Sequence, residues 1–328
     1  MESHLARTLV VRELVTDWVQ LLIATATALL GALGLAYWAS RAQSDRSALV
    51  GINLLFGIPA ALLLIAGGAV LLRGDRVLGP LLLLVGIGFG LPLLRQFREL
   101  LARVTPLDPE SAIDMTGLSI VLGLLGLFIG NSLAPMAGDP PELLPSIGIF
   151  ELLVQAAAFV AIAYIAVGFP YWRDLRAATA RLGIVAPTPR AIGIAIAATF
   201  ACFAVAAIAG LASQQFDPEL TESLNEVVDQ MTAQVQNPVG AIVLGASAGI
   251  GEETIFRGAL QPRYGIIIPS LLFTMLHGPQ YGFNLALLGL LGVSIILGLL
   301  RQHVNTTAAM ITHALYNAVQ VLALSALS

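Results

Sequence analysis

The sequence contains no lysine and little charge of either sign. Only 11% of its 328 residues are charged, and its basic residues, all arginine, never form a run. Soluble globular domains carry about 25% charged residues, so this composition excludes an ordinary soluble fold. The absence of a basic run, with a formal net charge of -4, also argues against a nucleic-acid partner.

Cysteine is nearly absent as well. The single residue, Cys202, cannot form a disulfide within the chain, and it lies in an apolar stretch where a thiol is poorly ionised. Hydrophobic residues are abundant, at 57% of the chain, and the mean hydropathy is +0.87. This composition is typical of a polytopic membrane protein.

Long apolar runs predict about ten membrane spans, at roughly 20 residues per crossing. We therefore expect an all-α polytopic bundle of transmembrane helices. It should consist of an N-terminal extension of about four spans, at 1–145, and a core of about six spans, at 146–328. The predicted spans are 18–39, 49–72, 77–94, 115–136, 149–169, 191–212, 239–259, 264–277, 283–300 and 304–324.

The distribution of arginine predicts the orientation. The loops after the third and fifth predicted spans are rich in arginine, and the turns after the seventh and ninth also carry it, whereas 137–148, 213–238 and 278–282 have none. Cytoplasmic loops carry an excess of basic residues, so we expect the arginine-rich ends to be cytoplasmic. The first two loops are ambiguous. The general composition of the chain favours a bacterial protein, and therefore a bacterial plasma membrane.

One outer loop contains a predicted amphipathic helix. Asp217 and Pro218 form a helix start, with a capping acid followed by proline at the first helical position. Apolar residues then follow at helical spacing up to Val235. The helix is expected to lie on the outer membrane surface or to cap the bundle. A packed surface helix is at least as compatible with this pattern as a functional lid.

Two adjacent carboxylates and an arginine, Glu252, Glu253 and Arg257, interrupt the seventh predicted span. An ionisable side chain inside a membrane costs about 2.5 kcal/mol or more and is usually functional. Adjacent helical residues point about 100° apart, so the two glutamates cannot face one point. Glu253 and Arg257 have the favoured i, i+4 spacing. We therefore assign that pair a mainly structural role and Glu252 the chemistry, with the reverse assignment as the alternative.

Two histidines and an asparagine lie in the following spans. At about 1.5 Å per helical residue, Glu252 lies roughly 15 Å from the cytoplasmic turn, His277 roughly 20 Å and His313 roughly 14 Å. Asn317 lies one turn beyond His313 on the same helix face. A glutamate, two histidines and an asparagine can therefore meet in one intramembrane cavity. The cavity must be hydrated, or the carboxylate would protonate.

These residues form three ordered motifs in the last four spans. Residues about 240–325 thereby resemble the CPBP family (CAAX proteases and bacteriocin-processing enzymes), also called the Abi family of intramembrane proteases. The motifs are Glu-Glu-x-x-x-Arg, Phe-x-x-x-His and His-x-x-x-Asn, formed by Glu252, Glu253, Arg257, Phe273, His277, His313 and Asn317.

The resemblance implies an intramembrane endopeptidase. Its substrate would be a membrane-associated or CAAX-like peptide or protein, and its other partner the lipid bilayer. Glu252 and His277 would activate a water molecule, and His313 and Asn317 would stabilise the oxyanion. No serine or cysteine is placed to act as a nucleophile beside a base, which favours direct attack by water.

The remaining motif residues, Glu253, Arg257 and Phe273, would support the site. Members of the family are often called metalloproteases, and zinc bound by Glu252, His277 and His313 is the alternative to a reaction without a cofactor. The chain has no His-Glu-x-x-His motif, and the same residue types serve a glutamate-type protease. We favour the mechanism without metal.

Two other classes of protein are compatible with these residues. A proton-coupled transporter could titrate Glu252, but the two halves of the sequence show no inverted repeat. A non-catalytic immunity or scaffold protein could keep the fold. A degenerate copy would lose one of Glu252, His277 or His313, and all three are present.

Overall fold

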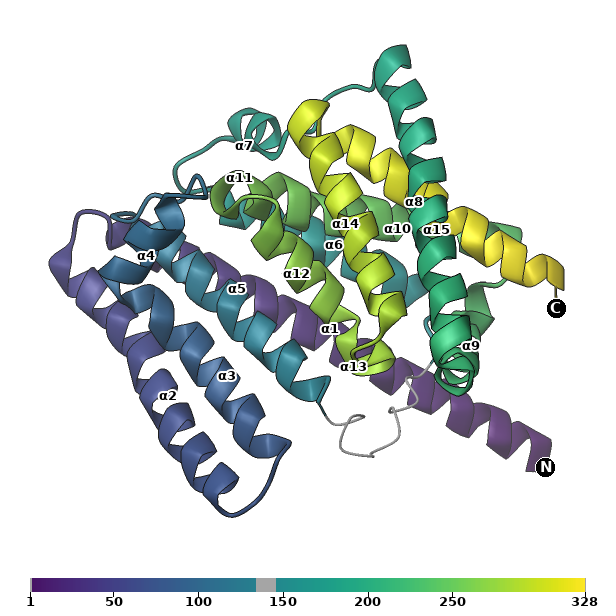
Figure 1. The fold of residues 1–328 in the computed structure, drawn as a ribbon, viewed down its shortest axis with the longest axis horizontal. Helices are drawn as coiled ribbons and strands as arrows, with labels where there is room; N and C mark the ends of the chain where they lie inside the picture. Colours follow the sequence, from purple (N-terminus) through teal and green to yellow (C-terminus); the bar gives the residue numbers. More distant parts are fainter. Residues whose placement is uncertain (1, 134–145, 328) are drawn as a thin grey trace.

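A computed structural model describes residues 2–133 and 146–327, and within these ranges every regular element is a helix (Figure 1). The predicted all-α membrane bundle is confirmed. Eight helices are long and apolar enough to cross a membrane. They are α1 (Glu2–Arg41), α2 (Arg46–Leu72), α5 (Ala112–Asn131), α6 (Ile149–Ala166), α8 (Pro189–Phe216), α10 (Pro238–Glu253) with its helical continuation to Tyr264, α14 (Leu285–His303) and α15 (Thr306–Leu327).

Two further predicted spans differ from a straight crossing. The third consists of α3 (Leu78–Gly90), extended to Leu93, and α4 (Arg95–Ala102), and the two parts meet at a bend of 82°. The eighth corresponds to the short α12 (Ile267–Leu276). Each of the ten predicted spans therefore coincides with a helix or a bent pair, but among the described residues only eight helices, or nine spans with the bent pair, are long enough to cross a membrane, and α12 is not. The end of the fourth predicted span, 134–136, lies outside the described residues.

The bend between α3 and α4 is stabilised by an arginine. Leu94 has an extended conformation, so the last carbonyl groups of the preceding helix have no partner within it. Arg98 donates from Nη1 to the carbonyl oxygen of Pro92 at 2.6 Å and from Nε to that of Pro109 at 2.7 Å. The arginine thus stabilises both sides of the turn.

The C-terminal helices form the part of the bundle that carries the motifs. Helix α10 packs between α6 and α15. At Gly249 the two backbones of α10 and α15 approach closely, because a Cβ there would lie 2.6 Å from the carbonyl oxygen of Met310. A Cβ at Gly245 would likewise lie too close to the carbonyl oxygen of Ala314 on α15. These two glycines, four residues apart on one helix face, therefore allow α10 to pack directly against the helix that carries His313.

The predicted amphipathic helix is α9 (Pro218–Thr232), and it packs on the bundle. Asp217 caps it by accepting a hydrogen bond from the backbone N–H of Leu220 at 3.1 Å. Leu224 and Val227 are buried. With α8, α14 and α15, α9 lines a cavity of about 420 Å³. Of the two expected positions, the structure therefore favours the cap over the membrane surface.

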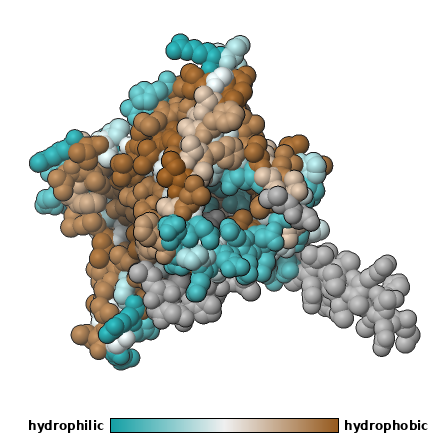
Figure 2. Space-filling model, turned by 45° about the vertical axis from the view of Figure 1, so that its right-hand side comes forward, coloured by the Kyte–Doolittle hydropathy of each residue, from teal (hydrophilic) through white to brown (hydrophobic). Residues whose placement is uncertain are grey.

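Hydrophobic side chains cover much of the visible face of the molecule (Figure 2). Lipid is the solvent that such a surface requires, since large exposed apolar patches are rare on soluble monomers. The described structure is thus that of an integral membrane protein. The expected division into 1–145 and 146–328 stays a prediction, because 134–145, at its boundary, lie outside the described residues.

Candidate active site

The site begins where α10 ends. At Glu253 the α-helix widens into a π-helical turn, Thr254–Leu260, a feature often found at functional sites. Glu253 Oε2 and Arg257 Nε lie 3.2 Å apart, and the two side chains are 0% and 1% exposed. The ion pair predicted from the i, i+4 spacing is therefore confirmed, and it is fully buried.

Arg257 is held by more than this carboxylate. Its Nη2 donates to both the carbonyl oxygen and the hydroxyl oxygen of Ser294 on α14, each at 2.9 Å. The guanidinium also lies 4.8 Å from the ring centroid of Phe273, a distance at which the ring attracts a cation. The arginine therefore joins α10, α12 and α14 behind the motif residues.

Glu253 connects this arginine to the last motif. Its Oε1 lies 2.8 Å from His313 Nδ1, and His313 Nε2 lies 3.2 Å from Asn317 Nδ2. Because an ionised carboxylate only accepts hydrogen bonds, Nδ1 carries the proton in this contact. The chain Arg257–Glu253–His313–Asn317 thus fixes the rotation of the imidazole ring and orients its other nitrogen toward Asn317.

Phe273 places the second histidine. Its ring centroid lies 5.4 Å from that of His277 and 5.7 Å from that of His313. His277 follows the last residue of α12, and its Nδ1 lies 3.0 Å from the carbonyl oxygen of Phe273. Since a carbonyl only accepts, Nδ1 is the donor, and in the neutral ring the lone pair is on Nε2. A packed Phe273 therefore supports both histidines.

Glu252 points toward a different helix. It is partly buried and lines a cavity of about 30 Å³ between α10 and α6, in which Gln155 and Ser247 supply further polar groups. A polar cavity needs about 10–15 Å³ to hold one water molecule, so this carboxylate has room for hydration. The expected divergence of the two glutamates is seen, and the contact with His313 belongs to Glu253, whereas the sequence led us to expect Glu252 beside the histidines.

The same residues can be tested against the zinc alternative. Among the described residues, no three side chains of histidine, cysteine, aspartate or glutamate lie together as a metal ion would require. In addition, Nδ1 of His313 is taken by Glu253. The arrangement of Glu252, His277 and His313 in the described structure does not fit a three-ligand zinc site.

Three contributors to the site were missed by the sequence analysis. Ser294 accepts from Arg257, Thr254 donates from its hydroxyl to the carbonyl oxygen of Ile250 at 2.5 Å, and Gln155 lines the same small cavity as Glu252. Ser294 and Gln155 are isolated polar residues in the middle of long apolar runs. That pattern could have identified them, since a polar group inside a membrane span needs a partner.

The fold and this cluster define a class: a polytopic helical membrane protein whose buried glutamate, arginine, histidine and asparagine form one hydrogen-bonded chain. Residues 234–319 match the family model of the type II CAAX prenyl endopeptidase Rce1-like proteins. No curated protein and no solved structure matched the chain. The matched segment contains all three motifs, so the predicted resemblance is confirmed there. It supports a CAAX-type intramembrane endopeptidase as the general class.

Proposed function

We propose that this protein hydrolyses a peptide bond of a membrane-associated or CAAX-like substrate by direct attack of water. The observation that carries the proposal is the buried contact of Glu253 with His313, at 2.8 Å. A carboxylate on one ring nitrogen fixes a histidine so that the other nitrogen can act on a substrate, as in the histidines of other hydrolases. A bundle that needed only helix packing would not require this buried ionic group.

Glu252 is the general base in this proposal. Its cavity has room for a water molecule, whereas the Glu253 carboxylate is fully buried between Arg257 and His313. As the water oxygen bonds to the substrate carbonyl carbon, Glu252 accepts the water proton. His277 does not line the cavity of Glu252, so its proposed contact with the same water requires that substrate binding bring the two side chains together. The carbonyl oxygen becomes an oxyanion. When the carbon–nitrogen bond breaks, the proton passes to the leaving amine.

His313 and Asn317 stabilise the oxyanion. Both can donate hydrogen bonds from side chains on one face of α15, four residues apart. His313 donates from Nε2 in its doubly protonated form, and Glu253, which accepts from Nδ1, stabilises this imidazolium. Preorganised donors of this kind contribute about 10²–10³-fold each to the rate. In the described site the amide nitrogen of Asn317 lies 3.2 Å from Nε2, so the two groups converge on one region.

Replacing Asn317 by alanine tests the oxyanion assignment. We expect kcat for cleavage of a lipid-anchored CAAX-type peptide to fall by about 10²–10³-fold, with little change in KM, because the lost donor acts mainly in the transition state. Gln320→Ala is the matched control, since Gln320 is an exposed amide one turn further along the same helix. Equal activity of the two variants would contradict the assignment.

Removal of metal distinguishes the proposed mechanism without metal from a zinc-dependent form of the same protease. We expect protein purified in the presence of a strong chelator to cleave the same peptide at an unchanged rate, because Glu252 alone can deprotonate the water. Elemental analysis of protein prepared without chelator should find no stoichiometric zinc. Loss of activity in chelator, restored by added zinc, would instead establish a metalloprotease.

The proposed setting is a bacterial plasma membrane with the arginine-rich ends in the cytoplasm. The ends of α1 and α6, the start of α5 and the turn after α10 border one shared cavity, which Arg263 also lines. The first predicted loop, between α1 and α2, therefore shares the side of the arginine-rich turns. This shared side supports a cytoplasmic position for that loop, which the arginines alone left ambiguous.

A further inference from the structure

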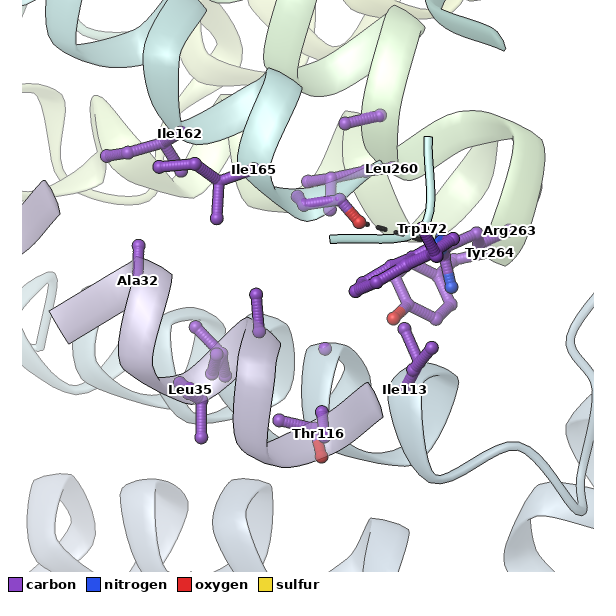
Figure 3. Close-up of a pocket in the computed structure, with 16 residues that line it drawn as sticks. Ala32, Leu35, Ile113, Thr116, Ile162, Ile165, Trp172, Leu260, Arg263 and Tyr264 are labelled. Carbon is purple, nitrogen blue, oxygen red and sulfur yellow. Dashed lines mark hydrogen bonds between the residues drawn. The ribbon is translucent and has the colours of Figure 1, made fainter. Parts of the chain in front are cut away.

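A second cavity lies where the N-terminal helices meet the core. It has a volume of about 140 Å³ and is bordered by α1, α5, α6 and the turn after α10 (Figure 3). Its walls are apolar, with Leu35 on α1, Ile113 on α5 and Ile162 on α6. An apolar cavity of about 150 Å³ binds benzene or xenon and excludes water. This one therefore has room for a short segment of hydrocarbon chain.

One end of this cavity is polar. Figure 3 shows Trp172, Arg263 and Tyr264 together at that end, away from the aliphatic side chains of α1 and α6. Arg263 is paired with Asp114, and Tyr264 donates from its hydroxyl to the carbonyl oxygen of Asp114 at 3.0 Å. Tryptophan and arginine are typical of the level at which lipid headgroups lie. The cavity thus leads from an apolar interior to an interfacial rim.

Further arginines gather at this rim. Arg173 donates to the carbonyl oxygen of Val167, and Arg263 Nη2 lies 3.5 Å from that of Ala166, so both guanidinium groups lie at the C-terminal end of α6. The guanidinium of Arg301 lies against Gly183, directly after α7 (Leu175–Leu182), which carries Arg181 in its last turn. Four cationic side chains from separate segments therefore meet here.

These cations outnumber the nearby acids. The pKa of Arg181 is lowered to about 10, first by burial and then by Arg263, Arg173 and Arg301 in that order, with only Asp114 opposing them. Burial and then Arg263 likewise lower the pKa of Arg173. Asp114 is already paired with Arg263, and Asp174 caps α7 by accepting from Ala177 N–H at 2.7 Å. The rim therefore has uncompensated positive charge that an anion would neutralise.

We propose that this cavity and its rim form a binding site for one anionic phospholipid. A segment of one acyl chain lies between α1, α5 and α6, and the phosphate is bound by Arg173, Arg181 and Arg263. Guanidinium groups bind phosphate through paired N–H donors, which ammonium groups cannot do. The site joins the N-terminal helices to the core beside the π-helical turn, which gives the otherwise unassigned N-terminal spans a role.

The test uses the full-length protein in nanodiscs and in neutral detergent. Native mass spectrometry is expected to find phosphatidylglycerol retained about tenfold more tightly than phosphatidylcholine, the scale of a single charge-assisted contact. The double variant Arg173→Gln/Arg181→Gln should lose this preference. The matched control, Arg73→Gln/Arg76→Gln, removes two exposed arginines from the α2–α3 turn and should keep it.

Two further measurements decide between occupants. Ala36→Leu fills the cavity from α1 and should weaken phosphatidylglycerol binding by about tenfold, the effect of excluding a few methylene groups. Inorganic phosphate should not displace the lipid. Equal retention of the two lipids by the wild type overturns the proposal, even if the variants fail to fold. Unchanged binding in Ala36→Leu, or displacement by phosphate alone or by a CAAX-type peptide, also overturns it.

Discussion

Glu252→Gln is expected to lower the rate of peptide cleavage by about 10²–10⁴-fold, because the amide cannot accept the proton of the attacking water. The substitution keeps the size of the side chain and its place beside Gln155 and Ser247 in the small cavity. The folded state should therefore be retained. The measurement is the single-turnover rate with a lipid-anchored CAAX-type peptide, together with thermal unfolding in detergent.

Glu222→Gln provides the control for this variant. Glu222 is exposed on α9, so its substitution removes the same charge without touching the site, and activity should be unchanged. Glu253→Gln is the informative comparison, since it breaks the contact with His313 and the pair with Arg257. If Glu252→Gln retained the wild-type rate while Glu253→Gln abolished it, the reverse assignment of the two glutamates would be correct.

Arg257→Met is expected to destabilise the protein by about 3–5 kcal/mol, because it leaves the Glu253 carboxylate buried without its cation. Both members of the pair are fully buried, so water cannot replace the arginine. The free energy of unfolding in mixed micelles measures the loss. Arg41→Met, which breaks an exposed pair with Asp45 at 3.7 Å, should cost less than about 1 kcal/mol.

The double variant Glu253→Met/Arg257→Met gives the sharper result. Apolar replacement of a complete buried ion pair is often neutral or stabilising, so the double variant should recover much of the stability that Arg257→Met loses. It should not recover activity, because His313 loses the acceptor at Nδ1. Full recovery of cleavage would show that the pair has no part in positioning His313. Additive losses of stability would show that the two residues do not act as a pair.

Much of the fold was predictable because membrane spans depend on a simple property of the sequence. Twenty apolar residues in a row require a helix, since lipid offers the backbone no hydrogen-bond partner. The bend at Leu94 was not predictable from apolar length. It depends on Arg98, which binds carbonyl groups on both sides of the turn. Likewise α12 was not predictable as a short element: it follows Gly265, whose φ is +74°, and ends at Leu276, just before a second short helix, Gly278–Tyr281.

The sequence predicted the contacts within one helix of the site, but it did not predict which side chains of neighbouring helices meet. The spacing within one helix predicted the Glu253–Arg257 pair, and the angle between adjacent residues predicted that Glu252 would point elsewhere. Which helix each glutamate faces depends on how α10 is rotated between α6 and α15. That rotation is set by the close contacts of glycines such as Gly249, and a single sequence does not contain it. The catalytic roles themselves stay predictions.

The central claim is that this membrane protein is an endopeptidase in which Glu252 activates water. The most direct test incubates wild type and Glu252→Gln in liposomes with a panel of lipid-anchored and unmodified CAAX-type peptides, followed by mass spectrometry of all products. The wild type should yield fragment pairs whose masses add up to that of the substrate plus one water, and Glu252→Gln should yield none. Absence of fragments with the wild type across the panel, or the same fragments at the same rate from both proteins, would contradict the claim.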